Sequence, residues 1–192
     1  GQFAVVTLRV EPYRPAPGEP NVLVVSEIRE GAISREYIPA IEQGVRDAAS
    51  AGVLAVYPMI DIKVTILDGQ EHPVDSSDIA FEHAAALAFR EAAQKAQPIL
   101  LEPIMNLQVT TPEEYFGSVT GDLTSRRAVI TETRQRGNIR IIESRAPLAA
   151  LFGYATSLRS LTQGRANPTN FAPSGYEPAP EDVTKRILET GY

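Results

Sequence analysis

The sequence predicts an α+β protein built from two modules, with elements in the order ββαβα and then βαββαβ. Three observations predict this class. Apolar residues alternate in short β-branched runs such as Ala4–Val10, which is typical of strands. Between these runs, apolar residues recur at helical spacing. Near residue 100, Gln97, Pro98 and Pro103 interrupt the chain where one set of elements ends and the next begins.

The first module begins with two predicted strands, Ala4–Val10 and Val22–Ile28, separated by a Pro-rich loop. Glu30-Gly31-Ala32 breaks the strand pattern, and Ser34-Arg35-Glu36 is a candidate helix cap. A helix follows and ends at Gly52, a natural stop. Its apolar positions at helical spacing are Ile38, Ile41, Val45, Ala48 and Ala49.

A long strand and an Ala-rich helix complete the first module. Tyr57–Leu67 has strand composition, and Asp68-Gly69 predicts a turn after it. Asp75-Ser76-Ser77 predicts the cap of a helix over Ile79–Ala96, worth about 1 kcal/mol, and Gln97-Pro98 ends that helix. The apolar strand face is Ile60, Ile62, Val64 and Ile66, and the bulky apolar helix residues are Phe81, Leu87 and Phe89.

The second module opens with a predicted strand, Ile104–Val109. Thr111-Pro112-Glu113-Glu114 combines a capping Thr, Pro at the first helical position and early acids, which predicts a helix to about Ser125. A hairpin around Arg136-Gly137-Asn138 joins two further strands. The remaining predictions are strands Ala128–Thr133 and Ile139–Glu143, a helix from Pro147 with Leu148, Leu151, Phe152 and Leu158, and a strand near Gly164–Phe171.

The order βαββαβ is that of a ferredoxin-like sandwich, two helices on an antiparallel sheet. We therefore predict an elongated ββαβα domain over residues 1–102 and a ferredoxin-like domain over residues 103–176. Residues 177–192 complete a Pro-rich linker, which begins at residue 173, and form a short closing helix, Glu181–Glu189. Because the first strand follows Gly1 without a cap or leader, we interpret the chain as a piece of a longer protein.

The composition is that of an ordinary core-forming protein. Of 192 residues, 43% are hydrophobic and 22% charged, and no apolar run approaches the roughly 20 residues that a membrane-spanning helix needs. The absence of Cys excludes disulfides and thiolate metal sites and is typical of a reducing compartment. Two histidines, His72 and His83, are too few for the usual structural zinc site. We expect a cytoplasmic monomer with no metal, no cofactor and no membrane partner.

Charge is unevenly distributed along the chain. Residues 1–102 hold 8 Lys/Arg against 15 Asp/Glu, giving −7, and residues 103–192 hold 10 against 9, giving +1. From Arg126 to Arg165 there are eight Arg against only Glu132 and Glu143. Such a basic stretch can meet phosphate although the whole chain carries −6. The alternative, equally open from composition, is a set of solvated strand and loop charges.

Several strings go beyond secondary structure. They are REYIPAIEQGV (35–45), YPMIDIKVTILDG (57–69), HPVDSSDIAF (72–81), PILLEPIM (98–105), TPEEYFGSVTGDLTSRR (111–127) and APLAALFGYATSLRSLTQGRA (146–166). In this order and spacing they resemble the last two domains, numbered IV and V, of the bacterial elongation factor G family of translational GTPases. The resemblance covers essentially the whole chain.

This resemblance implies a role in protein synthesis. Domain IV of the family is an elongated, ribosomal-protein-like domain whose tip reaches the decoding centre of the small ribosomal subunit and contacts tRNA and mRNA. Domain V is ferredoxin-like and contacts the GTPase-centre and sarcin–ricin RNA of the large subunit. Together they serve GTP-dependent translocation. GTP and Mg²⁺ belong to the family's GTPase domain, and the P-loop motif Gly-x-x-x-x-Gly-Lys-Ser/Thr is absent from this sequence. We expect no catalytic residue here.

By the same resemblance, His72 is the tip histidine. An imidazole there can stack on a ribose or base and hydrogen-bond to backbone oxygen. One alternative is a hydrolase triad of His72, Asp75 and Ser76 or Ser77, although no Gly-x-Ser-x-Gly elbow is present and sequence adjacency is not triad geometry. Another is a loop histidine without a role.

The loop before the first helix is the other tip loop by resemblance. The family usually shows Gly-Gly-Val-Ile-Pro there, whereas this chain has Glu30 before Gly31 and Ser34 in place of Pro. Glu30 is unfavourable near phosphate, and Arg35 offsets it in part. The predicted tRNA and mRNA contacts are Gly31, Ser34, Arg35, Gly69 and His72.

Four arginines are predicted to contact ribosomal RNA: Arg126, Arg127, Arg159 and Arg165. The arginine fork suits bidentate contact with phosphate. For Arg126 and Arg127 the alternative is an internal pair with Asp122 or Glu143. The family pattern has Gly after the two arginines, where this chain has Ala128.

Three rival functions remain. The departures at Glu30, Ser34, Ala128 and Val56, where the family commonly has Gly, suggest a paralogue that recycles ribosomes or dislodges a bound antibiotic. A free-standing RNA-binding or ribosome-assembly module is disfavoured by the abrupt start of the chain. A small hydrolase that uses His72 would lose turnover of an ester or amide in His72→Ala.

Overall fold

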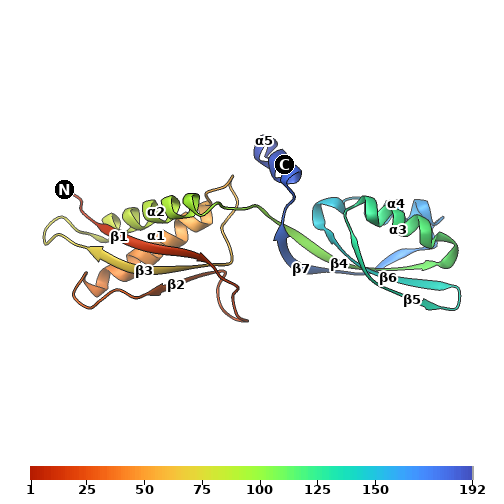
Figure 1. Ribbon diagram of the computed structural model, residues 1–192, viewed down its shortest axis with the longest axis horizontal. Coiled ribbons are helices and arrows are strands. Elements are labelled where there is room, and N and C mark those ends of the chain that lie inside the picture. The colour runs from red at the N-terminus through yellow and green to blue at the C-terminus, as the bar shows by residue number, and fades with distance from the viewer. Residues whose placement is uncertain (192) are drawn as a thin grey trace. The chain divides into compact units, whose positions relative to one another are not determined.

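Contacts between Cα atoms divide the chain into two compact units, drawn in Figure 1. The computed structural model describes residues 1–191. The first unit is Gly1–Ile99 with the chain end from Arg186, and the second is Leu100–Lys185. Each unit has its own sheet and its own hydrophobic core. The predicted α+β class is confirmed. Among the described residues, no helix has the length and apolar character to cross a membrane.

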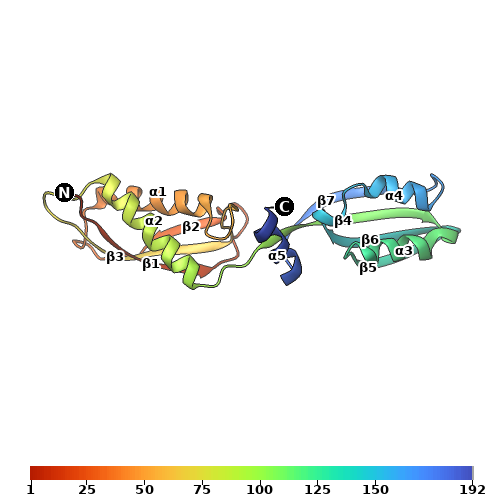
Figure 2. The same ribbon diagram turned by 90° about the horizontal axis from the view of Figure 1, so that it is seen from above.

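The first unit has the predicted order ββαβα. Strand β3 lies in the middle of a three-stranded sheet, antiparallel to β1 and parallel to β2. Helices α1 and α2 lie next to one another against this sheet (Figures 1 and 2). The elements are β1 (Val5–Pro12), β2 (Val22–Ser26), α1 (Ile38–Ala51), β3 (Ile62–Gln70) and α2 (Asp78–Lys95).

The core of the first unit lies between β3 and the two helices. The predicted apolar face of β3 is buried at Ile62, Val64 and Ile66, while Ile60 precedes the strand and is half-buried. Of the three bulky apolar residues of α2, Leu87 is 63% exposed, because the buried side of the helix follows the spacing of Phe81, Ala85, Phe89 and Ala93. Other buried residues of this core are Ile41, Val45, Ala48 and Ala49.

Two predictions about β3 were wrong. The strand begins at Ile62 and not at Tyr57, and it continues through Asp68-Gly69, where a turn was predicted. Asp68-Gly69 has turn composition, but Val6 and Thr7 of β1 pair with it, with a register shift next to Thr7. Pairing with a neighbouring strand thus overrides the local turn preference. Strand β2 also ends two residues early, at Ser26.

The two helix starts of the first unit differ. Ser77 caps α2 as predicted, since its Oγ accepts the N–H of Ala80 at 3.1 Å. Ser34 does not cap α1. A 3₁₀ turn, Arg35–Tyr37, precedes that helix, and the Ser34 hydroxyl donates elsewhere. Helix α1 ends at the predicted Gly52, whose φ of 77° favours glycine.

The second unit is the predicted ferredoxin-like sandwich. Its antiparallel sheet has the strand order β5-β6-β4-β7, and α3 and α4 lie on one face of it (Figure 1). Residues from both layers meet in the core, among them Leu107, Val109, Leu123, Ile142 and Leu158. The elements are β4 (Leu101–Pro112), α3 (Phe116–Ser125), β5 (Val129–Arg136), β6 (Ile139–Pro147), α4 (Tyr154–Leu161) and β7 (Asn167–Pro178).

Both helices of this unit start later than predicted, for the same reason. Strand β4 runs to Pro112, so Thr111 is a fully buried strand residue and not a helix cap. Strand β6 runs to Pro147. A 3₁₀ turn follows each Pro, Glu113–Tyr115 and Leu148–Ala150, before the α-helix begins. Pro fits this transition because it fixes φ and has no N–H to lose. Phe152, predicted inside the helix, precedes it and is 78% exposed.

The predicted Pro-rich linker from residue 173 is largely strand. β7 continues to Pro178 and pairs there with Leu101 of β4. It tolerates several Pro because it is an edge strand and needs only one row of backbone donors. The short closing helix exists as α5 (Glu181–Thr190).

Candidate functional site

Two loops and the N-terminal segment meet at one end of the first unit (Figures 1 and 2). Loop 1, residues 27–35, runs from the end of β2 to the first residue of the 3₁₀ turn before α1, and loop 2, residues 69–77, begins with the last two residues of β3. We call this region the tip. It contains all five predicted tRNA and mRNA contacts, namely Gly31, Ser34, Arg35, Gly69 and His72.

Close packing at Gly69 joins the loops. Ile33 of loop 1 is only 5% exposed. A Cβ added at Gly69 would lie 3.0 Å from the carbonyl oxygen of Val5 and 3.1 Å from Cγ2 of Ile33. Because only Gly leaves this space free, loop 1 packs directly on the end of β3. The immediate role of Gly69 is therefore in packing.

Polar contacts join the loops a second time. The Ser34 hydroxyl lies 3.0 Å from each carboxylate oxygen of Glu71, to which it donates. Tyr37, which follows loop 1, donates its hydroxyl to the carbonyl of Ser76 at 3.4 Å, and its ring stacks on Phe81 at 4.6 Å. Glu71 was missed in the sequence, because its partner lies 37 positions away and only its place next to His72 marked it.

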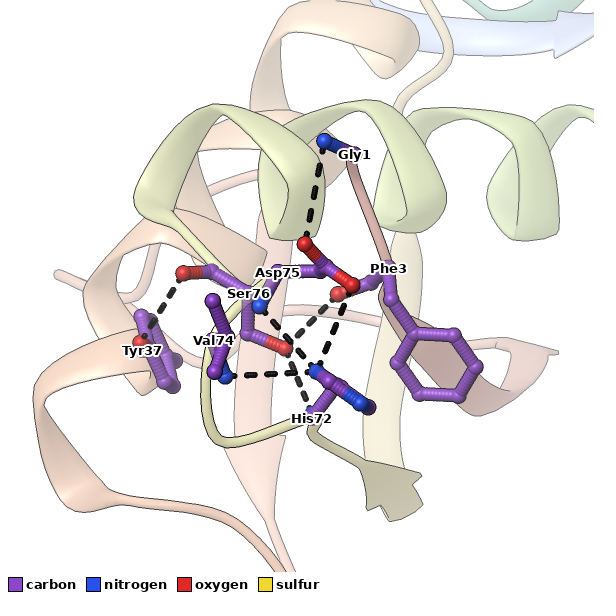
Figure 3. Close-up of polar contacts among 7 residues, drawn as sticks. All are labelled: Gly1, Phe3, Tyr37, His72, Val74, Asp75 and Ser76. Carbon is purple, nitrogen blue, oxygen red and sulfur yellow. Dashed lines mark hydrogen bonds and ion pairs between the residues drawn. The ribbon is translucent and has the colours of Figure 1, made fainter.

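His72 is held by its own loop, as Figure 3 shows. Its Nδ1 accepts the backbone N–H groups of Val74 and Asp75, each at 3.2 Å. The backbone N–H of His72 donates to Oγ of Ser76 at 2.8 Å, and the Ser76 hydroxyl donates to the carbonyl of Phe3 at 2.7 Å. The ring is tilted by 59° to that of Phe3, at 6.1 Å between centroids. The side chain remains 49% exposed.

The contacts around His72 are not those of a hydrolase triad. Such a triad needs a hydroxyl hydrogen-bonded to an imidazole nitrogen. The Ser76 hydroxyl is bound to main-chain groups of Phe3 and His72, and that of Ser77 caps α2. Within residues 1–191 there is also no group of three or more His, Asp and Glu side chains placed to hold a metal ion.

Loop 1 carries paired charges beside a shallow hollow. The Arg35 guanidinium lies 3.6 Å from the Glu30 carboxylate, and both side chains are almost fully exposed, at 89% and 88%. Salt screens such a pair, so both charges remain available to a partner. The hollow is about 470 Å³ and is lined by Ser26, Ile28, Arg29, Glu30, Gly31, Ile33, Arg35, Ile38 and Pro39.

In the second unit, Arg126 points inward. Its Nε donates to Asp122 at 3.1 Å, one of its terminal nitrogens donates to the carbonyl of Ala150 at 2.9 Å, and its guanidinium lies 5.1 Å from the Tyr154 ring centroid. The side chain is only 18% exposed. These contacts favour the internal pair with Asp122 over contact with RNA.

Arg127 is also paired internally, with a partner that was not predicted. It binds both carboxylate oxygens of Glu102, which is 6% exposed. The hydrogen bond to Glu102 raises the pKa of Arg127. Glu102 was missed because an acid in the apolar string LLEPIM shows no local sign of its partner, which follows α3.

Arg159 and Arg165 are more accessible. Arg159 is exposed on α4 and makes one hydrogen bond, Nε to Oδ1 of Asn167 at 3.3 Å. Arg165 pairs with Glu114, lies 5.7 Å from the Tyr115 ring centroid and is 56% exposed. A phosphate can reach either guanidinium without breaking the fold.

Each of the two units matches a known protein-family model. The model described as "Elongation factor G, domain IV" matches residues 1–97, and that described as "Elongation factor G C-terminus" matches residues 99–187. Elongation factor G of Petrotoga mobilis is 50% identical over 190 residues, and that of Fervidobacterium nodosum is 49% identical over 189. Each covers 98% of this chain.

The chain spans 27% of the length of these relatives. A crystal structure of a protein from Thermus thermophilus matches it with a TM-score of 0.85 and 37% identity, over 96% of this chain and 27% of that one. The fold of both units and the sequence matches agree. The chain belongs to the elongation factor G family, as the C-terminal part of a translation elongation factor, domain IV followed by domain V.

Proposed function

We propose that this chain is the ribosome-contacting part of a translational GTPase and promotes the movement of tRNA and mRNA by one codon. The tip carries this proposal. It presents the half-exposed imidazole of His72 on loop 2, and packing and hydrogen bonds hold loop 2 to loop 1. A preorganised loop pair suits recognition of RNA, whose exposed edges and 2′-hydroxyls are read by hydrogen bonds and stacking. Its proposed site is the decoding centre of the small subunit.

The second unit would contact the large subunit. Arg159 and Arg165 are exposed and suited to phosphate, and the GTPase-centre and sarcin–ricin RNA are their proposed partners. Arg126 and Arg127 would act indirectly, because their guanidinium groups already bind Asp122 and Glu102. They would hold the C-terminal end of α3 in place for contacts made by other residues.

The chemistry of GTP hydrolysis is proposed to lie outside these 192 residues, together with GTP and Mg²⁺. The sequence has no P-loop motif, and the chain corresponds to 27% of its relatives' length. Its own contribution would be binding and positioning. We propose that the intact factor acts as a cytoplasmic monomer with no membrane partner.

A second candidate is a family member that recycles ribosomes or dislodges an antibiotic from them. The charge of the tip favours it. Glu30 is 88% exposed, and Glu71 and Asp75 lie in loop 2 beside His72. Together with Glu27 of loop 1, these acids outnumber Arg29 and Arg35 in the tip and oppose close approach to phosphate, so a partner less rich in phosphate than a tRNA–mRNA duplex would suit it.

Footprinting separates these candidates. A full-length elongation factor G that carries this segment is bound to ribosomes with a non-hydrolysable GTP analogue, and the reactivity of ribosomal RNA is mapped. We expect protection of decoding-centre and sarcin–ricin nucleotides. Arg159→Ala with Arg165→Ala should weaken only the large-subunit protection. Protection confined to the large subunit would contradict the tip's proposed role, and subunit splitting would then be the activity to measure.

A further inference from the structure

The hydrogen bonds of His72 define which ring nitrogen carries the proton. Nδ1 accepts two backbone N–H groups, from Val74 and Asp75 at 3.2 Å each. A nitrogen that accepts two donors offers its lone pair and carries no proton of its own. In the neutral ring the proton is then on Nε2. The loop's own backbone therefore selects one of the two tautomers.

Asp75 does not reverse this assignment. Its Oδ2 lies 3.4 Å from Nδ1 and would accept only from a protonated nitrogen. The two amide donors are closer, and both come from peptide groups fixed between His72 and the Ser77 cap of α2. The backbone contacts thus decide the state of the neutral ring.

The hydroxyl of Ser76 holds the backbone of His72 in the position that these contacts need. It accepts the N–H of His72 at 2.8 Å and donates to the carbonyl of Phe3 at 2.7 Å. One side chain thereby ties loop 2 to the segment leading into β1. The second imidazole nitrogen lies on the side of the ring away from these bonds (Figure 3), and none of the contacts described for residues 1–191 involves it.

We propose that Ser76 is a positioning residue that fixes His72 as a neutral donor through Nε2–H, for an acceptor oxygen of RNA. This inference rests on the proposed function and names the chemistry of its contact. A phosphate oxygen, a 2′-hydroxyl and a base carbonyl all offer such an acceptor.

The first test is spectroscopic and needs no ribosome. Long-range ¹⁵N–¹H correlation of the histidine-labelled chain, at a pH where both rings are neutral, reports which nitrogen is protonated. His83 is exposed on α2 and serves as the unconstrained reference. We expect His72 to be more completely in the Nε2–H form than His83. Ser76→Ala should lower the Nε2–H fraction of His72 toward that of His83. Ser76→Thr, which keeps the hydroxyl, should restore the parent's fraction.

The matched control for Ser76 is Ser77→Asp, which changes the neighbouring serine but keeps a cap on α2. It should leave the His72 pattern unchanged. A His72 ring protonated on Nδ1 would overturn the proposal, and so would a pattern that is the same with and without the Ser76 hydroxyl while the chain remains folded.

The second test uses the full-length factor on ribosomes. Gln places its amide N–H₂ near the position of Nε2, whereas Asn places its own near Nδ1. We expect His72→Gln to translocate about two- to tenfold faster than His72→Asn, the factor that corresponds to one hydrogen bond. Equal rates for these two variants, both slower than the parent, would overturn the donor role. If His72→Ala is as fast as the parent, the proposed function fails while the tautomer assignment stands on its own measurement.

Discussion

Gly44 lets helices α1 and α2 approach each other closely because it has no side chain. It lies in the middle of α1, where a Cβ would come within 2.3 Å of the carbonyl oxygen of Glu82 in α2. Two helices can approach so closely only where a side chain is absent. This contact could not be predicted from the sequence, since an isolated Gly in a helical pattern has no partner written beside it.

We predict that Gly44→Ala destabilises the first unit by about 1–3 kcal/mol, because overpacking outweighs the better helix propensity of Ala. Gly121→Ala in α3 is the control. Nothing lies within 4 Å of its added Cβ, so propensity alone should stabilise that helix by about 0.5–1 kcal/mol. Urea unfolding followed by circular dichroism measures both. A stabilising Gly44→Ala would show that the helices do not approach as described.

Tyr154 is a second residue whose effect follows from its surroundings. It is 3% exposed, and its hydroxyl has no hydrogen-bond partner in the described structure. Removing an unpaired buried hydroxyl relieves its desolvation penalty. We therefore predict that Tyr154→Phe raises the free energy of unfolding by about 1 kcal/mol and keeps the ring contact with Arg126. A loss of stability in urea unfolding would imply a partner for that hydroxyl.

The same residue gives a pH dependence. Burial raises the pKa of Tyr154 above its ordinary value of 10.0, so the folded state keeps a proton that the unfolded state loses. The free energy of unfolding is therefore unaffected by the ionisation of this group below pH 10. It falls as the pH rises further, by at most about 1.4 kcal/mol per pH unit. The unfolding free energies of the parent and Tyr154→Phe, compared between about pH 9 and 11, should diverge in that direction. Parallel profiles would contradict it.

At the scale of elements, the pair of Arg127 with Glu102 joins the chain after α3 to the beginning of β4. We predict that Arg127→Ala destabilises the second unit by about 2 kcal/mol, because it leaves a buried carboxylate unpaired. Arg159→Ala should change stability by less than about 0.5 kcal/mol, since its side chain is exposed. Chemical unfolding checks both values.

Ribosome binding separates the two arginines further. Arg159→Ala should weaken protection of large-subunit RNA without loss of fold. Any effect of Arg127→Ala should follow its loss of stability and disappear when the fold is stabilised by lower temperature. Arg127→Ala that is fully stable yet defective in RNA protection would return Arg127 to the set of direct contacts.

Elements with a local signal were predictable from the sequence. Alternation located β1, and the turn at Arg136-Gly137-Asn138 located the hairpin of β5 and β6. Ser77 and Gly52 marked a helix start and a helix end correctly. The failures share a cause. Asp68-Gly69, Thr111-Pro112 and Pro147 have turn or cap composition, yet each lies in a strand because a neighbouring strand pairs with it. Pairing over long sequence distances is not written in local composition.

The tip, too, could be predicted from the sequence only in part. Resemblance to the family located His72 and loop 1, but the bonds that hold them could not be predicted. Ser34 and Glu71 are 37 residues apart, and Ser76 reaches Phe3 across 73. Both bonds depend on the positions of strands that bring distant loops together.

At the scale of the whole chain, charge separates the two domains. The first carries the acidic excess, and the second carries the arginine-rich stretch. The second domain should therefore supply most of the electrostatic attraction to ribosomal RNA, and the tip should select its partner by shape and hydrogen bonds. The affinity of the full-length factor for ribosomes should accordingly fall steeply with salt in the parent and less steeply in Arg159→Ala with Arg165→Ala.

The most direct test of the central claim is a toeprint assay of translocation. This segment is joined to the GTPase half of an established elongation factor G and compared with its His72→Ala version. We expect the parent to move mRNA by one codon, and His72→Ala to slow that step while ribosome-dependent GTP hydrolysis continues. A factor that hydrolyses GTP on ribosomes but never shifts the toeprint would contradict a role in translocation and direct the work to ribosome recycling.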